Sequence, residues 1–115
     1  MNYGYCRVSA RDQNLNRQFE AMNMAGVELP YIFIDKESGK NFDRVGYQSM
    51  KKRIRSGDCI FVQSLDRFGR NYTEIMEEWR DIISRGVDIV VIDMEILDTR
   101  TAGRNGLVGR FVSDL

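Results

Sequence analysis

Short apolar runs alternate along the chain with longer stretches in which apolar residues recur every three or four positions. The short runs are typical of buried strands, and the longer spacing is typical of helices with one buried face. We expect strands at residues 3–8, 31–34, 59–62 and 89–92. The run at 89–92 contains only isoleucine and valine, which favours a strand buried on both faces of a parallel sheet.

Helices are predicted between these strands, and each of them ends at a glycine. Asp12 can cap the first helix, which Gly26 would terminate, and the next two would end at Gly57 and Gly86. This alternation predicts an α/β fold with three layers, in which helices flank a mostly parallel central sheet. A further amphipathic stretch, residues 106–115, also has helical spacing.

Composition narrows the classes of protein to consider. With 43% apolar and 30% charged residues, the 115-residue chain can bury the core of one domain. No apolar run approaches the roughly 20 residues that span a bilayer, so we expect a cytoplasmic protein without membrane contact. Cys6 and Cys59 match no disulfide or metal-ligand spacing, and we expect both thiols to be buried and reduced.

Charge and residue usage bear more directly on chemistry. The net charge is zero, which does not indicate a generic nucleic-acid binder. Lysine occupies only positions 36, 40, 51 and 52 among the 17 basic residues, so arginine predominates, and arginine is suited to bidentate phosphate contacts. The chain has no histidine, which excludes a Ser-His-Asp triad, histidine metal ligands and a histidine general base.

The first candidate site lies at the end of the first predicted strand. Side chains two residues apart in a strand point the same way, so Arg7 and Ser9 would share a face. A guanidinium beside a hydroxyl suits attack on a phosphate, because the cation positions the oxygens and stabilises their charge. Alone the pair is weak evidence, since a serine after a strand is more often a turn or capping residue.

The second candidate site is the segment Asp-Arg-Phe-Gly-Arg at residues 66–70. Arg67 and Arg70 are three residues apart, so in a helical turn they would share a face and could clamp the oxygens of a phosphodiester. Gly69 would let the backbone approach a ligand, and Asp66 could orient an arginine or move a proton. A solvated helix start with an ordinary Asp–Arg pair is an equally good interpretation.

Other polar residues could support such a site. Arg44 lies in a long loop that could close over a phosphate, although a plain surface loop is the more common explanation. Gln13 and Gln18 lie on the first predicted helix, where an exposed polar side chain is the default. Their amides could bind phosphate or hold the arginines.

Three of these segments follow predicted strands. Ser9, Asp35 and the pair Asp66-Arg67 each come directly after an apolar run. Ligands gather at the carboxyl ends of the strands in parallel α/β sheets. We therefore expect these side chains to converge on one edge of the sheet.

In combination, these segments resemble the serine site-specific recombinases of the resolvase/invertase type. Members of that family open with Y-x-R-V-S, continue through a charged middle loop and carry an L-D-R-x-x-R block. The corresponding segments here are residues 5–9, 35–44 and 65–70. The spacing between the blocks also fits, and the resemblance covers roughly residues 3–100.

The resemblance implies a catalytic role for five residues. Ser9 would attack a DNA phosphodiester, form a 5′-phosphoserine link and free a 3′-hydroxyl. Arg7, Arg67 and Arg70 would bind the scissile phosphate and stabilise its transition state. Asp66 would protonate the leaving group or orient an arginine.

The resemblance also implies supporting residues and partners. Phosphate binding or support of the pocket would fall to Gln13, Gln18, Asp35 and Arg44. The family needs no metal and no cofactor, acts on double-stranded DNA, and works in full-length form as a homodimer that assembles into a tetramer. Residues 1–103 would then be the catalytic domain, and residues 104–115 the start of a long helix that builds the dimer and contacts DNA.

Two other classes of function stay open. A metal-dependent nuclease could bind a divalent cation through Asp35, Asp66 and Asp93, which all lie near predicted strand ends. A regulatory or protein-binding α/β module could have the same fold without chemistry. A tyrosine recombinase is disfavoured by the absence of histidine, and a C-x₅-R phosphatase loop fails because Asp12 occupies the arginine position.

Overall fold

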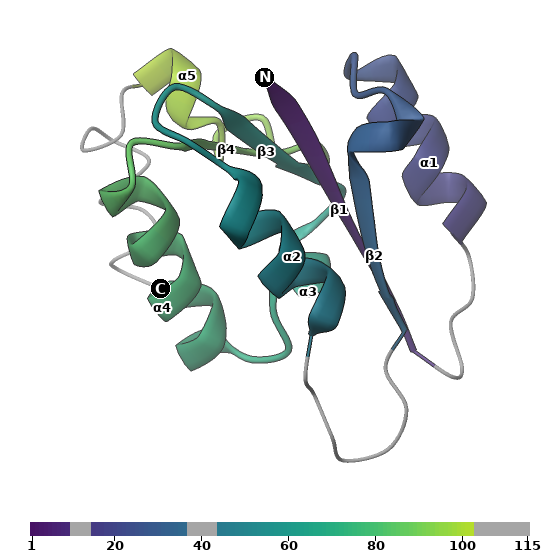
Figure 1. The fold of residues 1–115 in the computed structure, drawn as a ribbon, viewed down its shortest axis with the longest axis horizontal. Coiled ribbons are helices and arrows are strands. Elements are labelled where there is room, and N and C mark those ends of the chain that lie inside the picture. The colour runs from purple at the N-terminus through teal and green to yellow at the C-terminus, as the bar shows by residue number, and fades with distance from the viewer. Residues whose placement is uncertain (10–14, 37–43, 103–115) are drawn as a thin grey trace.

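A single parallel sheet organises the part of the chain that the structure describes. This computed structural model describes residues 1–9, 15–36 and 44–102. Of residues 101 and 102 it describes the backbone only. Four strands pair in the order β2-β1-β3-β4, and every pairing is parallel (Figure 1). They are β1 (Asn2–Val8), β2 (Ile32–Lys36), β3 (Cys59–Val62) and β4 (Asp88–Val91). The predicted strands and the predicted parallel sheet are confirmed.

The predicted end of the second strand is wrong. We expected the second strand to end at Ile34 and to place Asp35 after it, but β2 continues through Asp35 and Lys36. The reason is pairing: β1 extends to Val8, and Asp35 lies opposite Arg7 in the ladder. The interaction that lengthens β2 therefore comes from a strand far away in the sequence.

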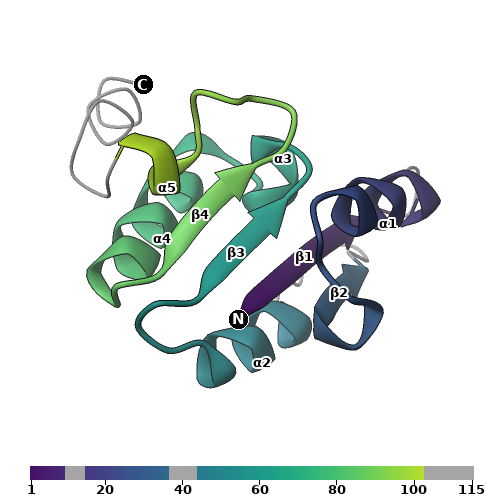
Figure 2. The same cartoon turned by 90° about the horizontal axis from the view of Figure 1, so that it is seen from above.

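Helices cover both faces of the sheet. The helices are α1 (Leu15–Met24), α2 (Val45–Arg53), α3 (Leu65–Phe68), α4 (Tyr72–Ser84) and α5 (Thr99–Ala102), with a short 3₁₀ turn, η1, at Leu29–Tyr31. Figure 2 shows α1 and α2 on opposite sides of β1 and β2. Right-handed crossovers require this arrangement, because the chain steps from β1 to β2 in one direction and from β2 back to β3 in the other.

Alternation along β1 divides the core into two clusters. Tyr3 and Tyr5 pack with residues of α2 and α4 on one face, whereas Cys6 packs with Met22 of α1 on the other. Gly4 has no side chain on the α1 face, and a Cβ there would lie 2.9 Å from the Met22 sulfur. The absence of a side chain at this position therefore lets α1 lie close to the sheet.

Two of the three predicted glycine stops are confirmed by backbone geometry: Gly26 follows α1 with φ +91°, and Gly86 follows α4 with φ +78°. The stop predicted at Gly57 is wrong, because α2 already ends at Arg53, where Ile54 turns extended, and Gly57 with φ +96° belongs to the turn before β3. These values fall in the left-handed region that a residue with a Cβ rarely adopts. The predicted cap Asp12 and the predicted C-terminal helix lie outside the described residues. Within the described part of the chain, no helix is both long and apolar enough to cross a membrane.

Candidate active site at the carboxyl edge of the sheet

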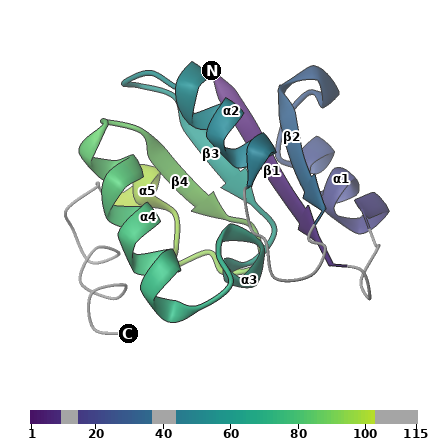
Figure 3. The same ribbon diagram turned by 60° about the horizontal axis from the view of Figure 1, so that its bottom comes forward.

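The candidate residues gather where the strand order reverses. The chain leaves β1 toward β2 on one side, while β3 lies on the other side of β1. Parallel α/β sheets bind ligands at the carboxyl end of such a switch point. Ser9 follows β1 directly and is half-buried, and α3 begins three residues after β3. Figure 3 shows α3 beside this carboxyl edge.

Arg7 joins the end of β1 to the turn that contains α3. Arg7 is only 9% exposed. The Nη2 atom donates hydrogen bonds to the main-chain oxygen of Asp66 and, at 3.4 Å, to that of Gly69. In return, Arg67 Nη1 donates to the main-chain oxygen of Arg7 at 3.0 Å. The two sequence motifs, separated by about sixty positions, are thus held together as predicted.

Gln18 completes the hydrogen bonding of β1 at the same point. The pairing of β1 with β3 runs only as far as Gly4, so the next part of β1 needs other partners on that side. The Gln18 amide accepts from Arg7 N at 3.2 Å and donates to Arg7 O at 3.2 Å. Gln18 is fully buried, so the default expectation of an exposed helical amide is wrong.

The predicted shared face of Arg67 and Arg70 is also wrong. The helix α3 ends at Phe68, and Gly69 follows in an extended conformation with φ −156°. Arg67 is therefore half-buried against Arg7, while Arg70 lies beyond the helix and is exposed. Gly69 is required by packing within the chain, because a Cβ there would lie 2.8 Å from the side chain of Ile75.

Arg44 lies in the interior and not on a surface loop. It is 7% exposed, and its guanidinium carbon is 3.9 Å from the centre of the Tyr47 ring. Its Nη2 atom donates to Phe68 O at 2.5 Å, and its Nη1 atom forms an ion pair with Glu74 at 3.2 Å. Arg44 therefore supports the same turn that Arg7 holds from the opposite end.

Asp35 ties this arginine to the start of α2. Its carboxylate accepts from Gly46 N at 2.7 Å and Tyr47 N at 3.0 Å, which satisfies two unpaired donors of the helix N-terminus. Tyr5 donates its hydroxyl to the same carboxylate at 2.6 Å and accepts from Arg44 Nε at 3.4 Å. Asp35 thus holds Tyr5 and the start of α2 in place in this structure.

Three residues of this cluster were missed by reasoning from the sequence: Tyr5, Tyr47 and Glu74. The two tyrosines look like core residues, and Glu74 looks like an ordinary acidic residue in the first turn of a helix. Burial raises the pKa of the Tyr5 hydroxyl, the Arg44 guanidinium offsets part of the rise, and the hydrogen bond to Asp35 adds to it. Tyr5 is therefore a neutral hydrogen-bond donor and no base at neutral pH.

The thiols are poor nucleophiles in this fold. Burial raises the pKa of Cys6 to about 12, with Arg67 opposing the rise, and burial also raises the pKa of Cys59 to about 12. Since the thiolate is the reactive form, both cysteines are inert near neutral pH. The hydroxyl of Ser9, two residues after Arg7, is therefore the candidate nucleophile at this edge.

Asp66 and Gln13 are the remaining predicted site residues. The Asp66 side chain is exposed and accepts a hydrogen bond from the Ser64 hydroxyl. Gln13 lies outside the described residues. Among the residues that are described, no three Cys, Asp or Glu side chains are close enough to hold a metal ion. The ligand set Asp35, Asp66 and Asp93 is therefore not assembled.

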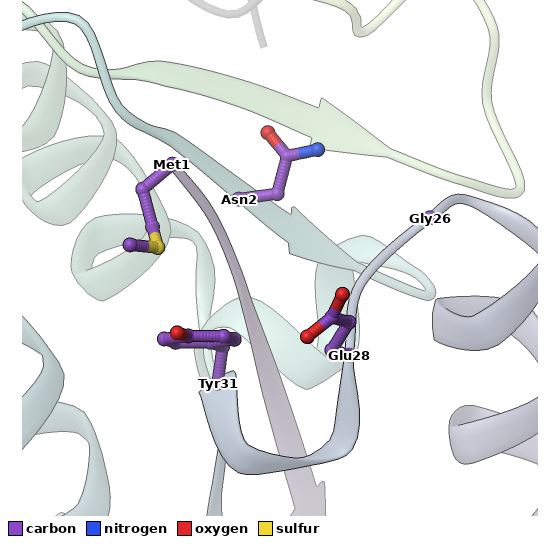
Figure 4. Close-up of a pocket in the computed structure, with 5 residues that line it drawn as sticks. All are labelled: Met1, Asn2, Gly26, Glu28 and Tyr31. Carbon is purple, nitrogen blue, oxygen red and sulfur yellow. The ribbon is translucent and has the colours of Figure 1, made fainter.

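A surface hollow lies at the other end of the sheet. It has a volume of about 270 Å³ and is lined by Met1, Asn2, Gly26, Glu28 and Tyr31 (Figure 4). These residues lie at or near the amino ends of β1 and β2. The hollow offers one carboxylate and no arginine, so it does not compete with the carboxyl edge as a phosphate site.

Comparison with known proteins adds an independent line of evidence. The family model "Resolvase, N terminal domain" matches residues 2–113. The transposon Tn3 resolvase of Escherichia coli is 37% identical over 91 residues, which are 79% of this chain and 49% of that protein. The serine recombinase gin of Escherichia phage Mu is 36% identical over 104 residues, which are 90% of this chain and 53% of that protein. The chain thus spans about half the length of these curated relatives.

A solved structure agrees in fold. A resolvase family site-specific recombinase from Streptococcus pneumoniae superposes with a TM-score of 0.76 and is 23% identical in sequence. The match covers 98% of this chain and 83% of that one. At this identity the likeness concerns the fold, and it extends to the four-stranded parallel sheet with helices on both faces.

Proposed function

Because this chain belongs to the resolvase N-terminal domain family of serine recombinases, we propose that it recombines DNA at specific sites, with Ser9 as the nucleophile. Its substrate is double-stranded DNA, which it cleaves and rejoins through a covalent 5′-phosphoserine intermediate. The reaction needs no metal and no cofactor. The full-length protein acts in the cytoplasm as a homodimer that assembles into a tetramer.

One observation carries this proposal. Arg7 donates to the carbonyls of Asp66 and Gly69, and Arg67 donates back to the carbonyl of Arg7. Ser9 is two residues beyond Arg7, a distance of about 7 Å along an extended chain. This short separation along the chain supports the proposal that the Ser9 hydroxyl meets the arginines at a switch point of the sheet. A cluster of arginines suits phosphoryl transfer, which depends mainly on positioning and on charge stabilisation.

The proposed step exchanges one phosphodiester for another. The Ser9 Oγ atom forms a bond to phosphorus while the bond from phosphorus to the 3′ oxygen breaks. The hydroxyl proton of Ser9 passes to solvent, and the 3′ oxygen gains a proton and leaves as a hydroxyl. The number of P–O bonds is unchanged, so the energy of the broken linkage is kept for rejoining. Asp66 is the proposed proton donor, or it orients an arginine that stabilises the leaving oxygen.

The arginines divide into two groups by their surroundings. Arg67 and Arg70, which are half-buried and exposed, are proposed to bind the non-bridging oxygens of the scissile phosphate. Arg7 binds main-chain oxygens of the turn and is proposed to add its positive charge near the phosphate. Arg44 is proposed to support the turn, because its guanidinium is held between tyrosine rings. Its charge is proposed to add to the positive potential at the site.

Two further residues complete the proposed site. Gln18 holds the main chain of Arg7, two residues before the nucleophile, through both of its amide atoms. Asp35 fixes Tyr5 and the start of α2, and so the position of the neighbouring arginine. Gln13 is assigned a supporting role by family resemblance. Residues 1–103 are proposed as the catalytic domain, and residues 104–115 as the start of the dimerisation helix.

Covalent trapping tests the proposed function. The full-length gene product is incubated in EDTA with a duplex that contains its crossover site, and a denaturing gel shows whether protein stays attached to a 5′ DNA end. We expect a linked product that disappears in Ser9→Ala. It should persist in Ser49→Ala, which changes an exposed serine on α2. Free ends that form only with a divalent metal would indicate a nuclease, and intact DNA bound by an assembled dimer would indicate a non-catalytic module.

A further inference from the structure

Glu74, in the first turn of α4, lies at the centre of contacts that no catalytic role explains. Its Oε1 atom accepts a hydrogen bond from the main-chain nitrogen of Arg70 at 3.0 Å. The same oxygen pairs with Arg44 Nη1 at 3.2 Å. The Glu74 side chain is 24% exposed and that of Arg44 is 5% exposed, so this ion pair is largely screened from solvent.

The geometry differs from ordinary capping of a helix. Asn71 is the N-cap of α4 and accepts from Glu74 N at 2.9 Å. In a capping box, a glutamate at this position would return its carboxylate to the main-chain N–H of the cap residue itself. Here the carboxylate receives the N–H of Arg70, one residue further upstream. Glu74 therefore fixes the arginine that precedes the helix.

The contact completes a set of clamps on one turn. Three buried or partly buried charged side chains bind main-chain groups between residues 66 and 70. Arg7 binds the oxygens of Asp66 and Gly69, Arg44 binds the oxygen of Phe68, and Glu74 binds the nitrogen of Arg70. Glu74 is also paired with Arg44, so two of the three clamps are coupled.

The consequence is greatest at Arg70. This arginine follows an extended glycine and lies outside α3, so the short helix does not fix the direction of the arginine side chain. Its side chain is exposed, as a group that meets DNA must be. Holding its main-chain nitrogen fixes the point from which the long side chain extends. A guanidinium on a fixed base loses less freedom when it binds phosphate, and a misplacement of 1 Å at a reacting centre costs about a hundredfold in rate.

We propose that Glu74 is a positioning residue for phosphoryl transfer: its carboxylate fixes the main chain at Arg70, and through it the guanidinium that meets the scissile phosphate. The inference rests on the proposed function, because it assigns the phosphate of DNA as the partner of Arg70. Glu74 itself does not touch DNA. It acts through Arg70, with Arg44 holding its carboxylate in place.

The test compares two DNA linkages in the covalent trapping assay of the full-length protein. One duplex has the normal phosphodiester at the cleavage position, and the other has a methylphosphonate, which carries no charge for an arginine to neutralise. Glu74→Ala should slow formation of the covalent complex on the phosphodiester by about 10- to 100-fold. On the methylphosphonate the loss should be only a few-fold, since the charge contact with Arg70 matters less there.

Three variants separate positioning from folding. Glu74→Gln should stay within about fivefold of wild type, because its amide oxygen can still accept from Arg70 N, although the ion pair is lost. Glu77→Ala removes an exposed carboxylate one turn nearer the middle of α4 and should leave both rates unchanged. In an Arg70→Ala background, Glu74→Ala should add less than about threefold, because the two residues act as one unit. Urea unfolding of each variant confirms that the assay samples folded protein.

The outcomes are distinguishable from failure of the proposed function. If wild type forms a complex that depends on Ser9, but Glu74→Ala behaves like Glu77→Ala, the positioning role is wrong. Equal losses on both linkages, or losses that add to those of Arg70→Ala, would also overturn it. If wild type itself forms no complex that depends on Ser9, the proposed function fails and this inference fails with it.

Discussion

Replacing Gln18 with leucine tests the reasoning about the end of β1. Leucine is close to glutamine in volume but has no polar atom, so the change removes both hydrogen bonds to Arg7 with little change in packing. The Arg7 N–H would then lack its Gln18 acceptor in a fully buried setting, which costs about 1–3 kcal/mol. The Arg7 carbonyl keeps the Arg67 guanidinium at 3.0 Å, so its loss is smaller, about 0.5–1.5 kcal/mol.

Together these losses lower the free energy of unfolding by about 1.5–4.5 kcal/mol. With a urea m-value of about 1.5 kcal/mol/M, a loss of 3 kcal/mol moves the unfolding midpoint down by about 2 M. Equilibrium unfolding in urea at pH 7, followed by far-UV circular dichroism, measures this shift. The m-value should not change, because the surface exposed on unfolding is nearly the same.

A matched control is available on α2. Gln48 is exposed, and replacing it with leucine should change the free energy of unfolding by no more than about 0.5 kcal/mol. If Gln18→Leu unfolds at the same urea concentration as Gln48→Leu, the amide of Gln18 does not complete the hydrogen bonding of β1. The argument that this helix holds the main chain next to Ser9 would then be refuted.

Three further predictions follow from single contacts. Gly46→Ala should lower the melting temperature by several degrees, because the new Cβ would lie 2.6 Å from Ile34 O, a main-chain atom that cannot easily move away. An unchanged melting curve would contradict this close approach. Burial raises the pKa of Cys6 to about 12, so iodoacetamide at pH 8 should label this thiol only after unfolding in guanidinium. Mass spectrometry measures the labelling, and labelling of the native protein would disprove this prediction. The hydrogen bond from Arg100 lowers the pKa of Asp98 below its usual value, so the ion pair stabilises the fold above about pH 4 and this contribution is lost as pH falls further. Asp98→Asn should therefore lose less stability than wild type between pH 5 and pH 2 in urea titrations.

Much of the fold follows from local sequence pattern. The β-branched run in β4 and the apolar runs in β1 and β3 are strands because their side chains require burial on both faces of a sheet. Gly26 and Gly86 end their helices because a left-handed φ at those positions excludes most side chains. These features depend on residues within a few positions of one another, so the sequence alone indicates them.

The composition of the candidate site was also readable. A serine and an arginine at the end of a strand, and two arginines after another, predict phosphate chemistry without histidine. Their convergence at the carboxyl edge follows from the parallel sheet. Asp35 shows the limit of this reasoning, because its inclusion in β2 depends on pairing with Arg7.

What each side chain does at that edge was decided by contacts between distant segments. Gln18 and Arg44 look like surface residues in the sequence, yet both are buried, because the main-chain groups of Arg7 and Phe68 need partners that local structure does not supply. Glu74 looks like an ordinary residue of a first helical turn, and only the fold brings its carboxylate to Arg70 N and Arg44. The sequence by itself therefore determined which elements form and which chemistry is present. The tertiary structure alone decided which charged groups are buried in the scaffold and which are exposed at the edge, because burial and hydrogen bonding depend on residues that meet only after folding.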